Sequence, residues 1–354
     1  MNMNVNDANK NQSENGDVPI IELRDAEVVF TTRAGSGLFH KNKITAVNKV
    51  NLKLMPGKTI GIVGESGCGK STTANIMCGL QQVTSGKVLF KGQDVTHRTA
   101  KERMDIGRVV SVVFQDPAMA LNARMSVIDQ LIDPLVVHKI GSKAERDARA
   151  KELIRMVGLP HSVLGALPGQ LSGGQRQRVL IAMALTRDPK LIIADEPTTA
   201  LDVTVQKQVI DLLNELREKL GFAMVFVSHD LALVAKVAHS ITVMYAGQVV
   251  EQGATKEILT DPHHEYTRGL LGSVTSIEAG APRLHQVPGT VPSPSDFPKG
   301  DRFAPRSSHP DKGLDVRPIM KRIPGTWHFY AAQPEPETDA PYAILNASDQ
   351  GDVR

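Results

Sequence analysis

Two short glycine-containing segments constrain this chain more than any other part of its sequence. The first reads Gly64-Glu65-Ser66-Gly67-Cys68-Gly69-Lys70-Ser71 and fits the phosphate-binding loop G-x-x-x-x-G-K-[ST]. The second reads Leu171-Ser172-Gly173-Gly174-Gln175, and Leu191-Ile192-Ile193-Ala194-Asp195-Glu196 follows it closely. Many nucleotide-binding proteins contain the first segment, but very few contain both. The pair therefore restricts the chain to a narrow class of nucleotide-binding proteins.

Apolar runs and helical stretches alternate along most of the chain. The run at 59–63 ends at the loop and residues 71–80 read as a helix, which is the order that a phosphate loop needs. Further strands are predicted at 20–30, 109–114, 191–194 and 224–227, and further helices at 126–157 (interrupted at Gly141-Ser142), 173–185 and 203–220. This alternation predicts a parallel α/β core, and the helical middle predicts a subdomain inserted at about residues 116–186.

The composition changes after about residue 275. Prolines recur from Pro282 to Pro310 and break any long element. We therefore predict a small, loop-rich appendage at residues 276–332 and a loose tail at 333–354. Residues 1–18 are polar and predicted to be disordered, which leaves 19–275 as one nucleotide-binding domain. The chain shows no internal repeat, so one such domain per chain is expected.

The net charge and the cysteine content indicate which binding partners and which cellular compartment to expect. The net charge of +3 gives no reason to expect a nucleic-acid partner, which requires a clustered basic face. The two cysteines, Cys68 and Cys78, are too few and too close for a disulfide framework and suit a reducing cytoplasm. No apolar run has the length of a membrane-spanning helix. If the protein works at a membrane, other chains must hold it there.

The phosphate loop carries the most specific chemistry. Glycines let backbone N–H groups turn toward an anion, and the helix that follows directs its positive end at the same place. Lys70 is expected to reach the β- and γ-phosphates of ATP, and Ser71 to ligate Mg²⁺. The remaining positions of the loop and the adjacent Thr72 complete the predicted nucleotide-binding set. Cys68 is best interpreted as a small spacer.

Asp195 and Glu196 follow a buried strand. A carboxylate there is costly unless it is paired or lies near a metal, so Asp195 is expected to hold Mg²⁺ through water. Glu196 is expected to orient or deprotonate the attacking water. If strand geometry continues, the two side chains point in opposite directions.

From about residue 20 to residue 275 these motifs resemble the ATP-binding-cassette (ABC) ATPases. The resemblance implies a RecA-like parallel core, an antiparallel β part and an inserted helical subdomain. It assigns Gln115 to Mg²⁺ and the attacking water, and His229 to the γ-phosphate and to positioning of Glu196. Phe30 would stack on adenine, although Phe39 is an alternative because the segment from 31 to 45 is long.

The same resemblance implies a dimer. In the family the second segment serves the ATP of the opposite subunit, which assigns Ser172, Gly173, Gly174 and Gln175 to a partner's nucleotide. Asp202 would lie at the interface between the two cassettes. Since this chain carries one cassette, it must pair with an identical chain or with a homologous second subunit.

Two stretches narrow the resemblance to the peptide/nickel importer branch, namely Phe114-Gln115-Asp116-Pro117 and Asp261-Pro262-His263-His264-Glu265-Tyr266-Thr267-Arg268. This branch implies two permease subunits, an extracytoplasmic solute-binding protein and a peripheral place on the cytoplasmic face of the membrane. Short peptides are the expected solute, with nickel, glutathione or oligosaccharides as alternatives. The two histidines are expected to be a solvated helix start.

The appendage departs from its relatives in one respect. Many relatives bind an iron–sulfur cluster through cysteines that include the positions of Asp301 and Ser307, but this chain has no cysteine after Cys78. We predict no cluster, and packing around Phe303, Trp327 and Tyr330 or against a partner instead.

Three non-transport classes fit less well. ATPases of DNA repair separate the motifs by a long coiled coil, and cassette translation factors carry two cassettes per chain. A non-hydrolysing cassette would not need the intact set of Lys70, Asp195, Glu196 and His229.

Overall fold

The computed structural model describes residues 18–33, 41–199, 201–278, 287 and 289–333. The chain forms two compact units. We call the first the phosphate-loop unit, which comprises residues 1–55, 59–97 and 228–354, and the second the helical unit, which comprises residues 56–58 and 98–227.

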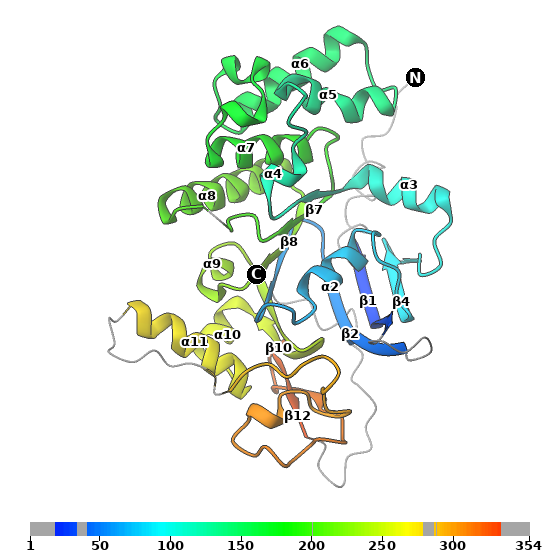
Figure 1. Ribbon diagram of the computed structural model, residues 1–354, viewed down its shortest axis with the longest axis vertical. Coiled ribbons are helices and arrows are strands. Elements are labelled where there is room, and N and C mark those ends of the chain that lie inside the picture. The colour runs from blue at the N-terminus through cyan, green and yellow to red at the C-terminus, as the bar shows by residue number, and fades with distance from the viewer. Residues whose placement is uncertain (1–17, 34–40, 200, 279–286, 288, 334–354) are drawn as a thin grey trace, which may run out of the picture. The chain divides into compact units, whose positions relative to one another are not determined.

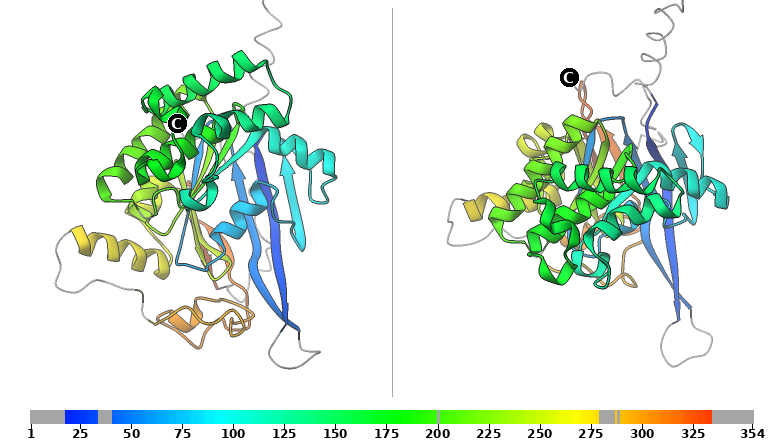
Figure 2. Two further views of the ribbon diagram at one scale, coloured as in Figure 1. Left: turned by 45° about the horizontal axis from the view of Figure 1, so that its top comes forward. Right: turned by 90° about the horizontal axis from the view of Figure 1, so that it is seen from above.

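An antiparallel sheet forms one part of the phosphate-loop unit. Its strands follow the order β2 (Lys41–Leu54), β1 (Ile21–Arg33), β4 (Ser85–Phe90) and β5 (Gln93–Asp94). Apolar residues alternate at the start of β1, where Ile21 and Leu23 are buried. Figure 2 shows β1 and β2 as a long pair of neighbouring strands. Residues 31–33 of the long segment from 31 to 45 belong to β1 and residues 41–45 belong to β2, whereas Phe39, the alternative to Phe30, lies outside the described residues.

The second sheet of this unit contains the strand that leads into the phosphate loop. Strand β3 (Thr59–Val63) is buried throughout and pairs in parallel with β9 (Ser240–Tyr245). Beyond β9 the order continues, antiparallel, with β10 (Gln248–Ala254), β12 (Phe329–Ala332) and β11 (Ile319–Arg322). Among its described residues, the α-helices of the unit are α2 (Lys70–Met77), α9 (Leu231–Ala235), α10 (Thr255–Thr260) and α11 (Glu265–Glu278).

Parallel strands support the helical unit. Strand β6 (Val110–Val113) pairs with β7 (Leu191–Asp195), which pairs with β8 (Ala223–Ser228). The first four residues of β7 and all of β8 are buried, which matches their continuous apolar sequence. The helices are α3 (Ala100–Val109), α4 (Pro117–Ala120), α5 (Val127–Val137), α6 (Lys143–Met156), α7 (Gly173–Ala184) and α8 (Val203–Leu220), with 3-10 turns η1 (His161–Gly165) and η2 (Pro168–Gln170).

Local sequence explains where these helices begin. Ser126 accepts a hydrogen bond from the N–H of Asp129 and starts α5, and Ser142 forms a capping box with Glu145 and starts α6. The predicted helix at 126–157 is therefore two helices separated at Gly141-Ser142, as the punctuation indicated. Figure 1 shows α5, α6 and α7 lying against one another.

The described part of the appendage is built into the phosphate-loop unit rather than attached loosely to it. Strand β12 pairs with β10, and Phe303, which precedes the 3-10 turn η3 (Ala304–Arg306), is buried against Tyr245 and Tyr266. Trp327 lies edge-on to Phe329, with ring centroids 6.2 Å apart. The expected packing around Phe303 and Trp327 is confirmed.

The two histidines before α11 do not form a solvated helix start, contrary to expectation. His264 is buried, and its Nδ1 accepts a hydrogen bond from the N–H of Tyr266. His263 stacks on Tyr330 of the appendage, with ring centroids 5.0 Å apart. The sequence alone indicated an exposed helix terminus. In the structure, Phe303 and Tyr330 of the appendage pack against these two histidines.

The predicted fold class is confirmed: parallel strands, an antiparallel β part and a set of helices all occur. Among the described residues, no helix combines the length and the apolar composition that crossing a bilayer requires.

Candidate nucleotide site

The phosphate loop joins β3 to α2 and depends on glycine at two of its positions. A Cβ atom on Gly64 (φ 153°) would lie 2.1 Å from the carbonyl oxygen of Met244, and one on Gly69 (φ 99°) would lie 2.5 Å from that of Ala46. A Cβ on Gly67 would meet no atom within 4 Å. The outer glycines thus allow the loop to pack on neighbouring backbone, while the middle one lies at its open side.

The loop is suited to hold an anion. Helix α2 begins without a side-chain cap, so the N–H groups of its first turn are directed at the loop. The Nζ of Lys70, a residue only 5% exposed, donates hydrogen bonds to the carbonyl oxygens of Gly64 (2.8 Å) and Glu65 (3.0 Å). An ammonium group across the loop and a helix N-terminus at its end fit the charge of a nucleotide's phosphates.

Cys68 is buried within the loop, which fits its interpretation as a spacer. Burial raises the pKa of its thiol to about 11, although the charge of Lys70 opposes this change. The thiol therefore stays protonated near neutral pH and is a poor nucleophile.

His229 belongs to the same unit and follows β8. Its neighbours Ser228 and Asp230 shape the turn, because Ser228 Oγ accepts a hydrogen bond from the N–H of Asp230 (3.0 Å) and Asp230 caps α9. The imidazole of His229 is exposed at the strand end.

The acidic residues lie in the helical unit at the end of β7. The strand ends at Asp195, and Glu196 takes a left-handed backbone conformation with φ 46°. The condition for the expected alternation of the two side chains is therefore not met, since strand geometry does not continue past Asp195. The N–H of Glu196 donates to the carbonyl oxygen of Val227 on β8 (2.9 Å), which fixes this turn.

Thr199 and Gln115 both donate hydrogen bonds to the carboxylate of Glu196. Its Oε2 accepts a hydrogen bond from the Oγ1 of Thr199 (2.9 Å) and one from the Nε2 of Gln115 (3.3 Å). Gln115 follows β6, the strand next to β7, so the parallel sheet brings it and Glu196 to the same edge. The sequence predicted Gln115 and missed Thr199, for which the only signal was its position three residues after Glu196.

The second glycine-containing segment, Leu171-Ser172-Gly173-Gly174-Gln175, is called the signature segment below. It forms the N-terminus of α7. Ser172 accepts a hydrogen bond from the N–H of Gln175 (3.2 Å), and the side chain of Gln175 accepts one from the N–H of Ser172 (2.9 Å). A Cβ on Gly174 would lie 2.9 Å from Cγ1 of Val205, so glycine allows α7 and α8 to pack closely here. Asp202 caps α8 through the N–H of Val205 (2.9 Å).

Two protein families match separate parts of the chain. Residues 47–199 match the family described as ABC transporter, and residues 250–312 match the family described as Oligopeptide/dipeptide transporter, C-terminal region. The first range contains the phosphate loop, Glu196 and the signature segment. The second contains most of β10 and the described start of the appendage.

The relatives extend over nearly the whole chain. The oligopeptide transport ATP-binding protein OppD of Bacillus subtilis is 40% identical over 338 residues, which cover 92% of this chain and 92% of that protein. This chain belongs to the ATP-binding proteins of ABC transporters. The dipeptide transport ATP-binding protein DppD of Escherichia coli is 46% identical over 268 residues, covering 74% of this chain and 82% of that protein.

Solved structures agree with the membership. Two dimeric structures of the ATP-binding cassette MJ0796, one of them in a post-hydrolysis state with ADP and Pi, are each 32% identical to this chain with a TM-score of 0.59. Each comparison covers 66% of this chain and 98% of the cassette. As an ABC ATPase, this chain binds and hydrolyses ATP.

Most of the predicted nucleotide-site residues lie in loops or at the N-termini of helices. Phe30 lies on β1 opposite Ile44 and is 40% exposed, and its contact with adenine stays a prediction. Besides Thr199, the sequence missed Tyr266 and Arg306, which contact Glu65 of the phosphate loop. Tyr266 lies in the stretch that narrowed the resemblance, but nothing in that stretch, or around Arg306, indicated a contact with the phosphate loop.

Asp301 and Ser307, which stand where relatives have cysteines, take part in local turns. Asp301 Oδ1 accepts a hydrogen bond from the N–H of Phe303 (2.8 Å), and Ser307 Oγ donates to the carbonyl oxygen of Ala304 (2.8 Å).

Proposed function

We propose that this chain is the ATPase subunit of an ABC importer of di- and oligopeptides. The observation that carries the solute class is the match of residues 250–312 to the C-terminal region of oligopeptide/dipeptide transporters. The structure makes that region an integral part of the phosphate-loop unit, because β10 starts it and β12 pairs with β10. OppD and DppD, which are similar over most of their length, are named for oligopeptide and dipeptide transport.

Each predicted residue has a role in this function. The amides of the loop from Gly64 to Thr72, together with Lys70, bind the phosphates. Ser71, Gln115 and Asp195 supply oxygen ligands of the kind that Mg²⁺ prefers. Bound MgATP supplies the phosphoanhydride bond whose cleavage releases free energy.

Hydrolysis itself depends on one carboxylate. Glu196 accepts a proton from the attacking water, and its hydrogen bonds from Thr199 and Gln115 orient it. His229 contacts the γ-phosphate and positions Glu196.

The signature segment and Asp202 serve the nucleotide of a second ATP-binding subunit. Two structural features support this role. Ser172 and Asp202 are exposed at the N-termini of α7 and α8, and the similar solved cassettes are dimers. The second subunit and two permease subunits complete the importer, in which this chain lies on the cytoplasmic face of the membrane and an extracytoplasmic solute-binding protein delivers the solute.

An uptake assay tests the proposal. The chain is co-expressed with its permease subunits and second ATP-binding subunit, and the complex is reconstituted in vesicles with a solute-binding protein and MgATP. We expect uptake of labelled tri- and pentapeptides that is lost in Glu196→Gln. Uptake of labelled nickel, glutathione or an oligosaccharide with no peptide uptake would reassign the solute. Failure to copurify with any permease would contradict the importer role.

A further inference from the structure

Glu65 places a carboxylate inside a loop whose task is to hold a polyanion. The residue directly follows Gly64 in the phosphate loop and belongs to the segment that Lys70 spans. An unpaired negative charge there would repel the phosphates of ATP, and solvent screens this repulsion only in part, because the side chain of Glu65 is 30% exposed. The structure must therefore either neutralise this carboxylate or direct it away from the phosphates.

All of the polar groups of Glu65 have partners. Its N–H donates a hydrogen bond to the hydroxyl oxygen of Tyr266 on α11 (2.8 Å). Its carbonyl oxygen accepts hydrogen bonds from Lys70 Nζ (3.0 Å) and from the N–H of Cys68 (3.3 Å). Its two carboxylate oxygens accept from the guanidinium of Arg306, at 2.8 Å and 3.2 Å. Glu65 is thus held on all sides, and the side-chain partner comes from the appendage.

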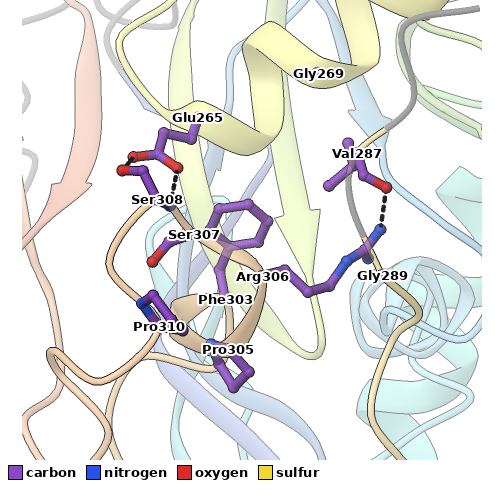
Figure 3. Close-up of a pocket in the computed structure, with 10 residues that line it drawn as sticks. All are labelled: Glu265, Gly269, Val287, Gly289, Phe303, Pro305, Arg306, Ser307, Ser308 and Pro310. Atoms are coloured by element: carbon purple, nitrogen blue, oxygen red, sulfur yellow. Dashed lines mark hydrogen bonds between the residues drawn. The ribbon is translucent and has the colours of Figure 1, made fainter.

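The side chain of Arg306 is buried and held in position for its contact with Glu65. Its side chain is 5% exposed, compared with 30% for that of Glu65, and its guanidinium lies 5.5 Å from the centre of the Tyr245 ring. Nη2 of Arg306 also donates a hydrogen bond to the carbonyl oxygen of Val287 (3.2 Å). Figure 3 shows this side chain extending from η3 beside Phe303 toward Val287. Burial opposes the charged guanidinium, but the hydrogen bonds to Glu65 and Tyr245 outweigh it and raise the pKa of Arg306.

Other contacts fix the backbone turn that carries Arg306. Phe303, three residues before it, packs edge-on against Tyr245 at 5.2 Å between ring centroids. The N–H of Arg302 donates to Gln248 Oε1 on β10 (3.1 Å), and its Nη1 donates to the carbonyl oxygen of Thr45 on β2 (2.9 Å). The turn that presents Arg306 is therefore tied to two strands next to the loop, so the guanidinium is preorganised before nucleotide binds.

We propose that Arg306 is a positioning residue of the nucleotide site, which neutralises Glu65 and holds the phosphate loop in its anion-binding shape. The appendage then contributes directly to ATP affinity instead of serving as a separate module. The inference rests on the proposed ATP-binding function of the loop. It concerns binding rather than the chemical step, because Arg306 contacts the loop through Glu65 and not the phosphates themselves.

The test is MgATP binding to the full-length chain, measured by isothermal titration calorimetry. Arg306→Gln removes the positive charge and leaves Glu65 unpaired, so we expect affinity to fall about tenfold. Glu65→Gln retains the backbone amide of the loop and removes the repulsive charge, so it is expected to bind MgATP more tightly than Arg306→Gln does. The double variant Glu65→Gln, Arg306→Gln is expected to recover most of the loss. Arg322→Gln, which removes a charge from β11 outside the loop contacts, is the matched control and is expected to bind normally.

The outcomes separate charge compensation from mere folding. Thermal unfolding of each variant shows whether the appendage stays folded. Unchanged affinity in Arg306→Gln would overturn the inference, and so would a loss that Glu65→Gln does not rescue, since that result assigns Arg306 a structural role only. If the unmodified chain itself fails to bind MgATP, the proposed function fails instead.

Discussion

The phosphate loop and the segment around Glu196 are held in place by different kinds of contact. The loop is fixed by residues far along the chain: Tyr266 and Arg306 lie 201 and 241 residues from Glu65. The carboxylate of Glu196 is held by Thr199, three residues away, and by the exposed Gln115 through a longer bond of 3.3 Å. The phosphate loop is held by a buried tyrosine and by a buried arginine that forms an ion pair with Glu65. The carboxylate of Glu196 accepts hydrogen bonds from the neutral side chains of Thr199 and Gln115.

This difference matches the two tasks. A loop that binds a polyanion gains affinity when its shape is set beforehand, because no ordering cost is then paid on binding. A carboxylate that accepts a proton must remain able to change charge. Hydrogen bonds from neighbouring side chains orient such a group for the attacking water. Substitutions in the two regions are therefore expected to affect different measured quantities.

The largest expected effect is at Glu196. Glu196→Gln retains the hydrogen-bonding shape but removes the base, so ATP turnover of the assembled importer should fall by about a hundredfold or more. MgATP affinity of the full-length chain should change little, because the phosphate loop is untouched. Turnover is measured by phosphate release and affinity by calorimetry. Persistent turnover would show that another group accepts the proton.

The next largest effect concerns the stability of the phosphate-loop unit. Glu251 on β10 is fully buried and accepts a hydrogen bond from His328 Nε2 (2.7 Å) and from the N–H groups of His263 and His264. Burial disfavours its ionised form, but these hydrogen bonds outweigh burial and lower the pKa of Glu251. His328→Ala removes the imidazole partner of this charge and should cost about 3 kcal/mol in the free energy of unfolding.

Urea denaturation measures that loss, and His309→Ala, at an exposed position of the appendage, is the control. The double variant Glu251→Gln, His328→Ala should regain part of the stability, since the buried charge is gone. A cost in His328→Ala no larger than in His309→Ala would show that the pair does not stabilise the unit.

A smaller effect should appear as a pH dependence. Burial lowers the pKa of His264 below its ordinary value of 6.5, against the opposing charges of Asp301, Glu251 and Glu265. In the unfolded chain the imidazole takes up a proton below that value, whereas in the folded chain it stays neutral. The stability contributed by neutral His264 is thus complete above about pH 6.5 and is lost as the pH falls toward the folded pKa.

Melting temperatures measured between about pH 7.5 and about pH 5.5 test this contribution. His264→Gln retains an acceptor for the N–H of Tyr266 but cannot be protonated. Its melting temperature should fall less over this range than that of the unmodified chain. Parallel curves for the two proteins would assign the pH dependence to other groups.

The smallest expected effect separates capping from nucleotide contact at the signature segment. Ser142 and Ser172 form equivalent capping boxes at the starts of α6 and α7. Ser142→Ala and Ser172→Ala should each cost about 1 kcal/mol in stability. Only Ser172→Ala should also reduce ATP turnover of the assembled importer. Equal turnover in both variants would restrict Ser172 to a capping role.

The local elements could be predicted because neighbouring residues determine them. The apolar run before Gly64 forms β3, the serines before two helical patterns cap α5 and α6, and the run before Asp195 forms β7. The conformation of Glu196 could not be predicted, since its left-handed backbone depends on a hydrogen bond to Val227 on another strand. The burial of His264 was missed for the same reason, because the residues that cover it come from the appendage.

The sequence by itself determined the chemistry of this protein, since the phosphate loop, the acidic strand end and the signature segment are each contiguous and carry their function in the order of their residues. Only the tertiary structure decided which distant groups complete them. Arg306 reaches Glu65, and His328 reaches Glu251, because strand pairing and burial bring them together. A buried charge requires a partner, but no local pattern states where in the chain that partner lies.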